Sequence, residues 1–161
     1  MGINLGSLLE RLNSKEEKGR LTFEAVWHRA TDDPKHIQEA IKYAISKKHF
    51  CDAAELFHRT GNNEKTIEFY IKAGGPNIKT AAIVAGNMGD EKRRKEIYNI
   101  LIDDYEDRGY FYQAAEYAVE IGFNERASQL YEKAGSYKEA IRQAEFAGNK
   151  ERAQILCLLH M

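Results

Sequence analysis

The segment Tyr110–Gly122 reads Y-F-Y-Q-A-A-E-Y-A-V-E-I-G, and Ser136–Gly148 reads S-Y-K-E-A-I-R-Q-A-E-F-A-G. Both segments carry an aromatic residue, an alanine three residues later, and a glycine eleven residues after the aromatic. A Glu-Arg pair begins three residues after each glycine. This pattern predicts a helix, a turn at the glycine and a second helix. Because such a hairpin buries its apolar face only against its neighbours, the duplication predicts a stack of hairpins.

The same spacing recurs twice upstream. The residues at these positions are Phe50, Ala53 and Gly61 in one unit and Ile78, Ala81 and Gly89 in the other. The four units start 28, 33 and 26 residues apart, so their loops differ in length. The small residue lets two helices lie close together, while the aromatic fills the space beside the preceding pair. An acidic-basic pair follows every glycine: Glu64-Lys65, Glu91-Lys92, Glu125-Arg126 and Glu151-Arg152.

The expected fold is all-α: an α-α superhelix, that is, a right-handed solenoid of about five antiparallel helical hairpins plus an N-terminal helix. Ile3 to about Asn13 is amphipathic and is expected to be a capping helix. A degenerate hairpin follows, with helices from near Leu21 and from about Pro34 to Lys47. We predict one helical-repeat domain over 1–161, divided into a cap at 1–19 and hairpins at 20–48, 49–75, 76–109, 110–135 and 136–161.

At these residues the chain resembles the tetratricopeptide repeat. The residues that follow the order and spacing of that motif are Phe111, Gly122, Ala127, Tyr131 and Ala134 in one unit and Phe50, Ala54, Phe57, Gly61, Tyr70 and Ala73 in another. The period of about 34 residues typical of the motif is absent, as is its terminal proline. The looser pattern is similar to the helical hairpins of vesicle-coat and intraflagellar-transport subunits. The resemblance covers about Phe50 to Leu156 and implies architecture rather than an activity.

The composition favours a folded protein of a reducing compartment. Apolar residues make up 43% of the chain and charged residues 30%, with a formal net charge of -1. The near-zero charge provides no global attraction for nucleic acid or an anionic membrane. Cys51 and Cys157 cannot form a disulfide framework of the secreted kind. No apolar run approaches the roughly 20 residues that span a bilayer, so we expect a cytoplasmic protein that does not insert into membranes.

No catalytic, cofactor or metal site is expected from the residue spacing. The five histidines are His28, His36, His49, His58 and His160. None lies four residues from another, and there is no HExxH motif. Cys51 and His58 are two helical turns apart, on the order of 10 Å, which is too far for one ion. A nucleophilic pair of Cys51 with His49 or His58 stays open as an alternative.

One predicted helix, from Asp90 to about Asp107, has an unusual charge distribution. Its first turns contain the basic run K-R-R-K, and its last turns contain a group of acidic residues. This order is opposite to what the helix dipole favours at each end, so helix stability does not explain it. We expect either a solvated face or a docking surface for acidic protein or phosphate. The candidate residues of the basic run are Lys92, Arg93, Arg94 and Lys95.

Two further groups are candidates for partner binding. Tyr110, Tyr112 and Tyr117 fall away from the face of Phe111, and could serve as aromatic anchors or as packing between hairpins. The last predicted helix carries apolar residues, among them Leu158 and Leu159, with no later helix to cover them. That uncovered face favours a homodimer, a larger assembly, a bound partner or a longer array.

The function expected from these patterns is a non-catalytic protein-protein interaction scaffold that presents a groove or face to a peptide or subunit. The alternative is a helical-repeat nucleic-acid-binding protein, motivated by the basic run and weakened by the near-zero charge. A small enzyme using Cys51 or a histidine is a third possibility, which requires a pocket that gathers those residues.

Overall fold

The computed structural model of the chain describes residues 34–160. This part consists of helices joined by short turns, without a strand. Its helices are α3 (Pro34–Ser46), α4 (Phe50–Arg59), α5 (Asn63–Ala73), α6 (Pro76–Asn87), α7 (Glu91–Asp107), α8 (Phe111–Glu120), α9 (Asn124–Lys133), α10 (Tyr137–Phe146) and α11 (Lys150–His160). The helices expected at 3–13 and from Leu21 lie outside the described residues.

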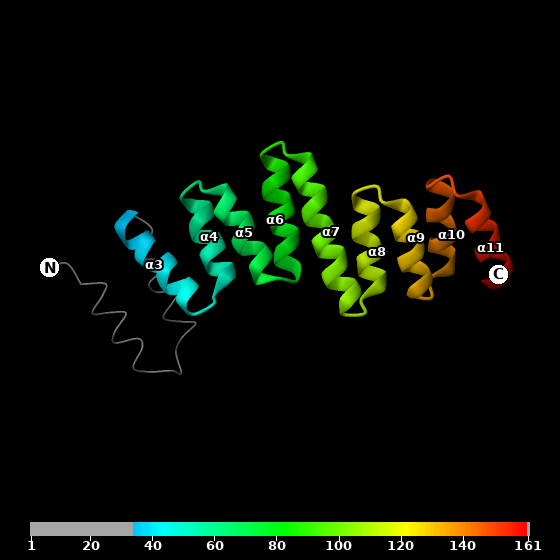
Figure 1. Ribbon diagram of the computed structural model, residues 1–161, viewed down its shortest axis with the longest axis horizontal. Helices are drawn as coiled ribbons and strands as arrows, with labels where there is room; N and C mark the ends of the chain where they lie inside the picture. The colour runs from blue at the N-terminus through cyan, green and yellow to red at the C-terminus, as the bar shows by residue number, and fades with distance from the viewer. Residues whose placement is uncertain (1–33, 161) are drawn as a thin grey trace.

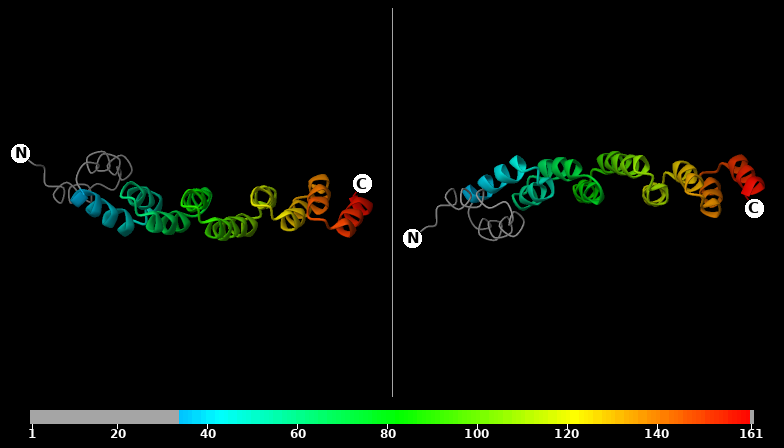
Figure 2. Two further views of the ribbon diagram at one scale, coloured as in Figure 1. Left: turned by 90° about the horizontal axis from the view of Figure 1, so that it is seen from above. Right: turned by 90° about the horizontal axis from the view of Figure 1, so that it is seen from below.

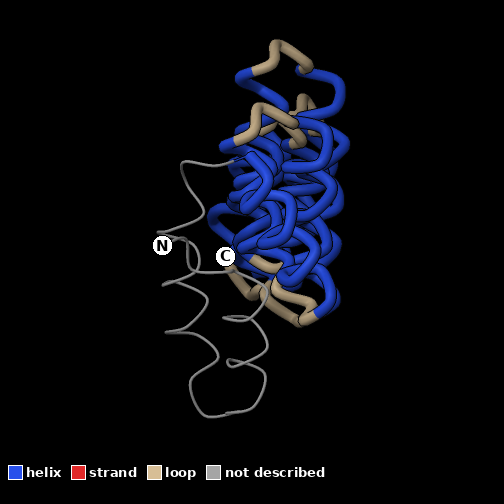
Figure 3. The backbone as a smooth tube through the Cα atoms, turned by 90° about the vertical axis from the view of Figure 1, so that its left-hand side faces the viewer, coloured by secondary structure: helices blue, strands red, loops and turns tan. Residues whose placement is uncertain are grey.

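The helices form a single extended row in which each packs against the next along the chain. Figure 1 shows the row from α3 to α11. Seen from above and below, the helices alternate between two layers, with α4, α6, α8 and α10 in one and α3, α5, α7, α9 and α11 in the other (Figure 2). Viewed along the row, the helices lie behind one another (Figure 3). The all-α solenoid predicted from the sequence is therefore confirmed.

From α4 onward, the consecutive helix pairs lie within the predicted hairpin ranges 49–75, 76–109, 110–135 and 136–161. Gly74 and Gly75 link α5 to α6, and Pro76 is the first residue of α6. Proline suits this position because the first turn of a helix leaves its N–H groups unpaired. The organisation of the whole chain as a single domain stays a prediction.

Buried alanines bring the helices together. In α8, Ala114, Ala115 and Ala118 have no exposed surface, and Ala53 and Ala81 are equally buried in the earlier units. A methyl side chain at the contact allows two helices to approach closely, and larger residues fill the space on either side. The aromatic-alanine spacing seen in the sequence therefore corresponds to the helix contacts of the core.

The glycines and the polar residues after them end one helix and begin the next. Gly122 and Gly148 have φ values of +78° and +77°, in the left-handed region that favours glycine. Asn62 Oδ1 accepts a hydrogen bond from the backbone N–H of Lys65 at 3.1 Å and so caps α5. Asp90 caps α7 in the same way, through the N–H of Arg93 at 2.9 Å.

Enlarging one of the buried alanines should destabilise the array. Ala115→Leu inserts three carbons at a fully buried contact of α8, and we expect it to lower the free energy of unfolding by about 1–3 kcal/mol. Urea denaturation followed by circular dichroism measures the change. The matched control is Glu116→Leu, which makes the same residue at the adjacent exposed position. Equal stability of the two variants would show that Ala115 is not at a tight contact.

Candidate functional site

In the basic run at the start of α7, both arginines and Lys92 have acidic partners. Arg93 Nη1 donates to both carboxylate oxygens of Glu64 in α5, at 2.7 and 2.6 Å. Arg94 donates to Glu91 at 3.1 Å, and its guanidinium lies 5.6 Å from the centre of the Tyr98 ring. Lys92 is exposed, with its Nζ 3.9 Å from a carboxylate oxygen of Glu96, and Lys95 is exposed as well. Both arginines of the run are therefore engaged within the protein.

The acidic end of α7 is engaged with α9. Arg126 of α9 binds Asp103, and it lies 3.3 Å from Glu106. Glu106 also accepts a hydrogen bond from Lys133 of α9. The reversed charge order of α7 is thus explained by its neighbours, because its first turn meets an acidic residue of α5 and its last turns meet basic residues of α9. These attractions act against the unfavourable interaction with the helix dipole.

The same contact recurs along the layer of second helices. Arg93, Arg126 and Arg152 are each the third residue of their helix, and each pairs with the preceding second helix. Arg152 binds Glu132 of α9 and donates through Nε to Ser128 Oγ at 3.0 Å. The sequence pattern contained this signal, since a basic residue recurs near the start of each second helix. The sequence did not reveal the acidic partners of these arginines, because the partners lie 20 to 29 residues away along the chain.

The candidate tyrosines belong to two separate aromatic clusters. The rings of Tyr110 and Tyr117 lie 6.0 and 5.1 Å from that of Tyr105 at the junction of α7 and α8. Tyr117 is half-buried, and its burial raises the pKa of its hydroxyl to about 12. Tyr112 packs edge-on against Tyr131 of α9 at 5.2 Å. Tyr110 and Tyr112 keep exposed surface, whereas Tyr117 is mainly a packing residue.

The outer side of α11 carries an apolar strip formed by Ile155, Leu158 and Leu159. Their exposed fractions are 49%, 86% and 68%, and their i, i+3, i+4 spacing places them on one side of the helix. The positions 26 residues earlier in α9 are occupied by the polar residues Gln129, Glu132 and Lys133. The last helix therefore departs from the repeat in chemistry, although it keeps the same register.

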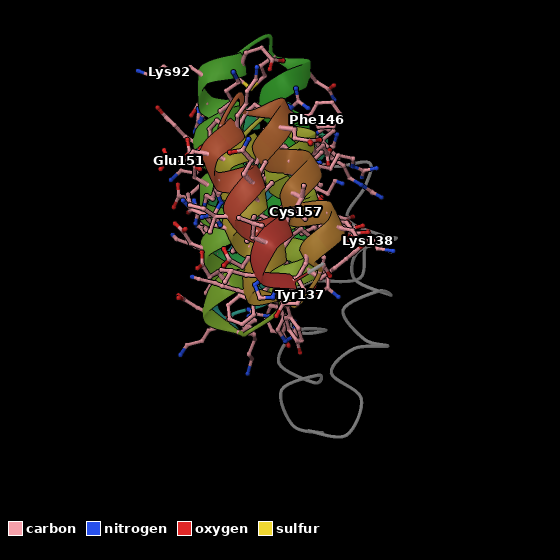
Figure 4. All side chains as sticks on the ribbon, turned by 90° about the vertical axis from the view of Figure 1, so that its right-hand side faces the viewer. Lys92, Tyr137, Lys138, Phe146, Glu151 and Cys157 are labelled. Carbon is pink, nitrogen blue, oxygen red and sulfur yellow. The ribbon has the colours of Figure 1, made fainter. Side chains whose placement is uncertain are left out.

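An open groove lies between α10 and α11 at the end of the row. Its volume is about 490 Å³. The residues that line this terminal groove are Ile141, Glu145, Lys150, Ala153, Gln154 and Cys157. Figure 4 looks onto this end, with Cys157 on α11 facing the viewer and Lys138 pointing away from α10 to the side. The groove and the apolar strip thus share α11, and together they form the candidate site.

Cys51 and two of the histidines considered for catalysis have identified neighbours. Cys51 Sγ donates to Asn77 Oδ1 at 3.4 Å, and burial, followed by the nearby Glu55 and Asp52, raises the pKa of the thiol. His49 Nδ1 lies 3.6 Å from Asp52. His160 stacks on Tyr137 with 3.6 Å between ring centres. The side chains of His28 and His36 lie outside the described part.

Residues 34–160 contain neither a cluster of metal-ligating side chains nor a helix that could span a membrane. No group of three or more His, Cys, Asp or Glu side chains there could hold a metal ion. None of the helices in the same part is long and apolar enough to cross a bilayer.

No protein-family model matches the chain, and comparison with curated proteins gives no match.

The pairing of α7 with α9 should make the stability depend on pH. Hydrogen bonds from Lys133 and then Arg126 lower the pKa of Glu106 below its usual 4.5. Because the native pKa is lowered, the stabilisation is complete above pH 4.5 and is lost as the pH falls through the native pKa. We expect Glu106→Gln to reduce stability by up to about 1 kcal/mol at pH 7, allowing for solvent screening. Urea midpoints at pH 7 and pH 3 measure the effect.

The difference between Glu106→Gln and the wild type should shrink at the lower pH. The control is Asp107→Asn, which removes an exposed carboxylate from the next position of α7. An unchanged difference at pH 3 would contradict the pairing of Glu106 with α9.

Proposed function

We propose that the chain is a non-catalytic protein-protein interaction scaffold of tetratricopeptide-like hairpins, which binds a protein partner through the apolar strip of α11. The observation that carries this proposal is the exposure of Leu158, at 86% of its surface, within a strip that also contains Ile155 and Leu159. Each exposed apolar side chain costs free energy in water at about 25 cal/mol per Å². A partner that covers the strip recovers this free energy on binding.

The comparison between α9 and α11 supports the proposal. Both helices occupy the same layer and carry their arginine at the third position, but α9 is polar at the three positions where α11 is apolar. Polar side chains such as those of α9 are usual at positions that face water. Contiguous exposed apolar residues are instead typical of interaction surfaces.

A non-catalytic role is supported by the state of Cys51. Nucleophilic catalysis requires a thiolate, which a lowered pKa or an adjacent base provides. The pKa of Cys51 is raised, and its thiol donates to the amide oxygen of Asn77. His49, one of its suggested partners, faces Asp52. A cytoplasmic scaffold remains the function that accounts for most of the chain's features.

The nucleic-acid alternative rests on Lys92 and Lys95, the two exposed members of the basic run. Arg93 and Arg94 already bind carboxylates within the protein, which reduces the charge available for phosphate. An electrophoretic shift with generic RNA that disappears in the variant Lys92→Ala with Lys95→Ala would favour this alternative over the scaffold.

Charges within the strip should abolish partner binding. We expect the double variant Leu158→Asp with Leu159→Asp to retain partners from the native cell extract at least about tenfold less than the wild type, because a charge resists desolvation at an apolar contact. Affinity purification with quantitative mass spectrometry measures retention. Both leucines are exposed, so thermal stability should be unchanged.

The matched control for this experiment is Ile83→Asp, which places the same charge on an exposed apolar residue of α6 in the other layer. It should retain the wild-type partners. If both variants keep the same partners as the wild type, the strip is not the binding surface.

A further inference from the structure

The turn between α3 and α4 differs from the later turns of the row at one backbone position. Every helix from α4 to α10 is followed within two residues by a glycine with positive φ. The corresponding residue after α3 is Lys48, with a φ of +60°, and no other residue except glycine has a positive φ in the described part of the chain. The backbone N–H of Lys48 donates to the carbonyl of Ile45 at 3.1 Å, as the N–H of Gly61 donates to that of His58 at 3.0 Å. The two turns are therefore built alike, with lysine in place of glycine.

Local stability does not explain a lysine at this position. In the left-handed region Cβ comes close to the following carbonyl oxygen, so a residue with a side chain is strained where glycine is not. A cation after the last turn of a helix interacts favourably with the helix dipole, but Lys47 already supplies one. Helices α6, α8 and α10 end without any basic residue in their last turn. The strain at Lys48 points instead to a role for its side chain outside the turn.

Lys48 belongs to a group of lysines without acidic partners. Several lysines of the later helices pair with a carboxylate, namely Lys65, Lys72, Lys79, Lys92 and Lys133. Lys42, Lys47 and Lys48 are exposed, and none of them forms an ion pair. About 8 Å of helix axis separates Lys42 from Lys47, and no acidic residue occurs between positions 42 and 49. These three lysines are here named the basic corner.

We propose that the basic corner binds an acidic segment of a partner protein. The site adds a second surface to the scaffold function proposed above, at the other end of the row from α11 (Figure 1). Neighbouring ammonium groups repel one another, and carboxylates of a bound segment would replace this repulsion by charge-assisted hydrogen bonds. Ile45, which is 37% exposed and lies three residues after Lys42, offers an apolar contact beside the charges.

The number of charges favours protein carboxylates over the phosphates of nucleic acid or of a membrane. Specific nucleic-acid binding commonly neutralises about 6–10 phosphates, and recognition of anionic lipids commonly uses clusters of about 4–8 basic residues. The basic corner offers three lysines on a chain with a formal net charge of -1. Three ammonium groups match two or three carboxylates of a short acidic segment. Lysine is used in the same way within this protein, where Lys72 and Lys79 each bind a single glutamate.

The test measures binding of a fluorescein-labelled peptide of eight glutamates to the full chain by fluorescence polarisation. We expect Lys48→Gly to weaken binding up to about fivefold, and the triple variant Lys42→Gln, Lys47→Gln, Lys48→Gly to weaken it at least about tenfold. Both differences should shrink as NaCl is raised, because salt screens exposed charges. Lys48→Gly should at the same time raise the thermal midpoint, because glycine relieves the strained φ. Loss of binding therefore cannot be ascribed to unfolding.

The matched control removes three exposed lysines without ion pairs from other helices, as the triple variant Lys95→Gln, Lys138→Gln, Lys150→Gln. It should bind the peptide like the wild type. Absence of peptide binding by the wild type, unchanged binding in the basic-corner variants, or equal weakening in the control would overturn the inference. Binding that depends on the basic corner but occurs only with phosphatidylserine vesicles or generic RNA would also overturn it, by identifying a different occupant. These outcomes are independent of partner retention through Leu158 and Leu159, so failure of this site is distinguishable from failure of the proposed function.

Discussion

The close approach of consecutive helices at buried alanines is the constraint on which this structure depends. Ala114, Ala115 and Ala118 have no exposed surface, and their methyl groups allow α8 to lie against its neighbours. A helix with such a face cannot bury it alone, so each hairpin requires the next one to be stable. The alternating layers of Figure 2 follow from this requirement, because each helix packs against the next one along the chain.

Ion pairs within one layer add a second set of contacts between hairpins. Arg93, Arg126 and Arg152 each reach back by one unit, and the acidic end of α7 supplies two of the partners. An isolated exposed pair contributes about 0.2–1 kcal/mol, so these contacts specify the register between units more than they hold the units together. The helix α11 occupies the same position in its hairpin as α9 does, but its side chains differ. The position that offers a carboxylate in α9 offers Leu158 in α11.

The candidate site follows from the way in which the last unit departs from the others. The terminal groove supplies a concave surface between α10 and α11, and the apolar strip supplies surface that water solvates poorly. A concave surface that buries little apolar area binds a partner weakly. An apolar surface without a matching shape discriminates poorly between partners. Both features involve one helix, α11.

The sequence by itself determined the helical hairpins, their boundaries and the alanine face, because helix periodicity, capping residues and left-handed glycines act over a few neighbouring residues. The apolar character of Leu158 and Leu159 was also evident from the repeat. Only the tertiary structure decided that Arg93 is held by Glu64, that Tyr117 is packed against Tyr105, and that α10 and α11 enclose a groove. Those features depend on the register between helices 12 to 29 residues apart, and local propensity does not specify that register.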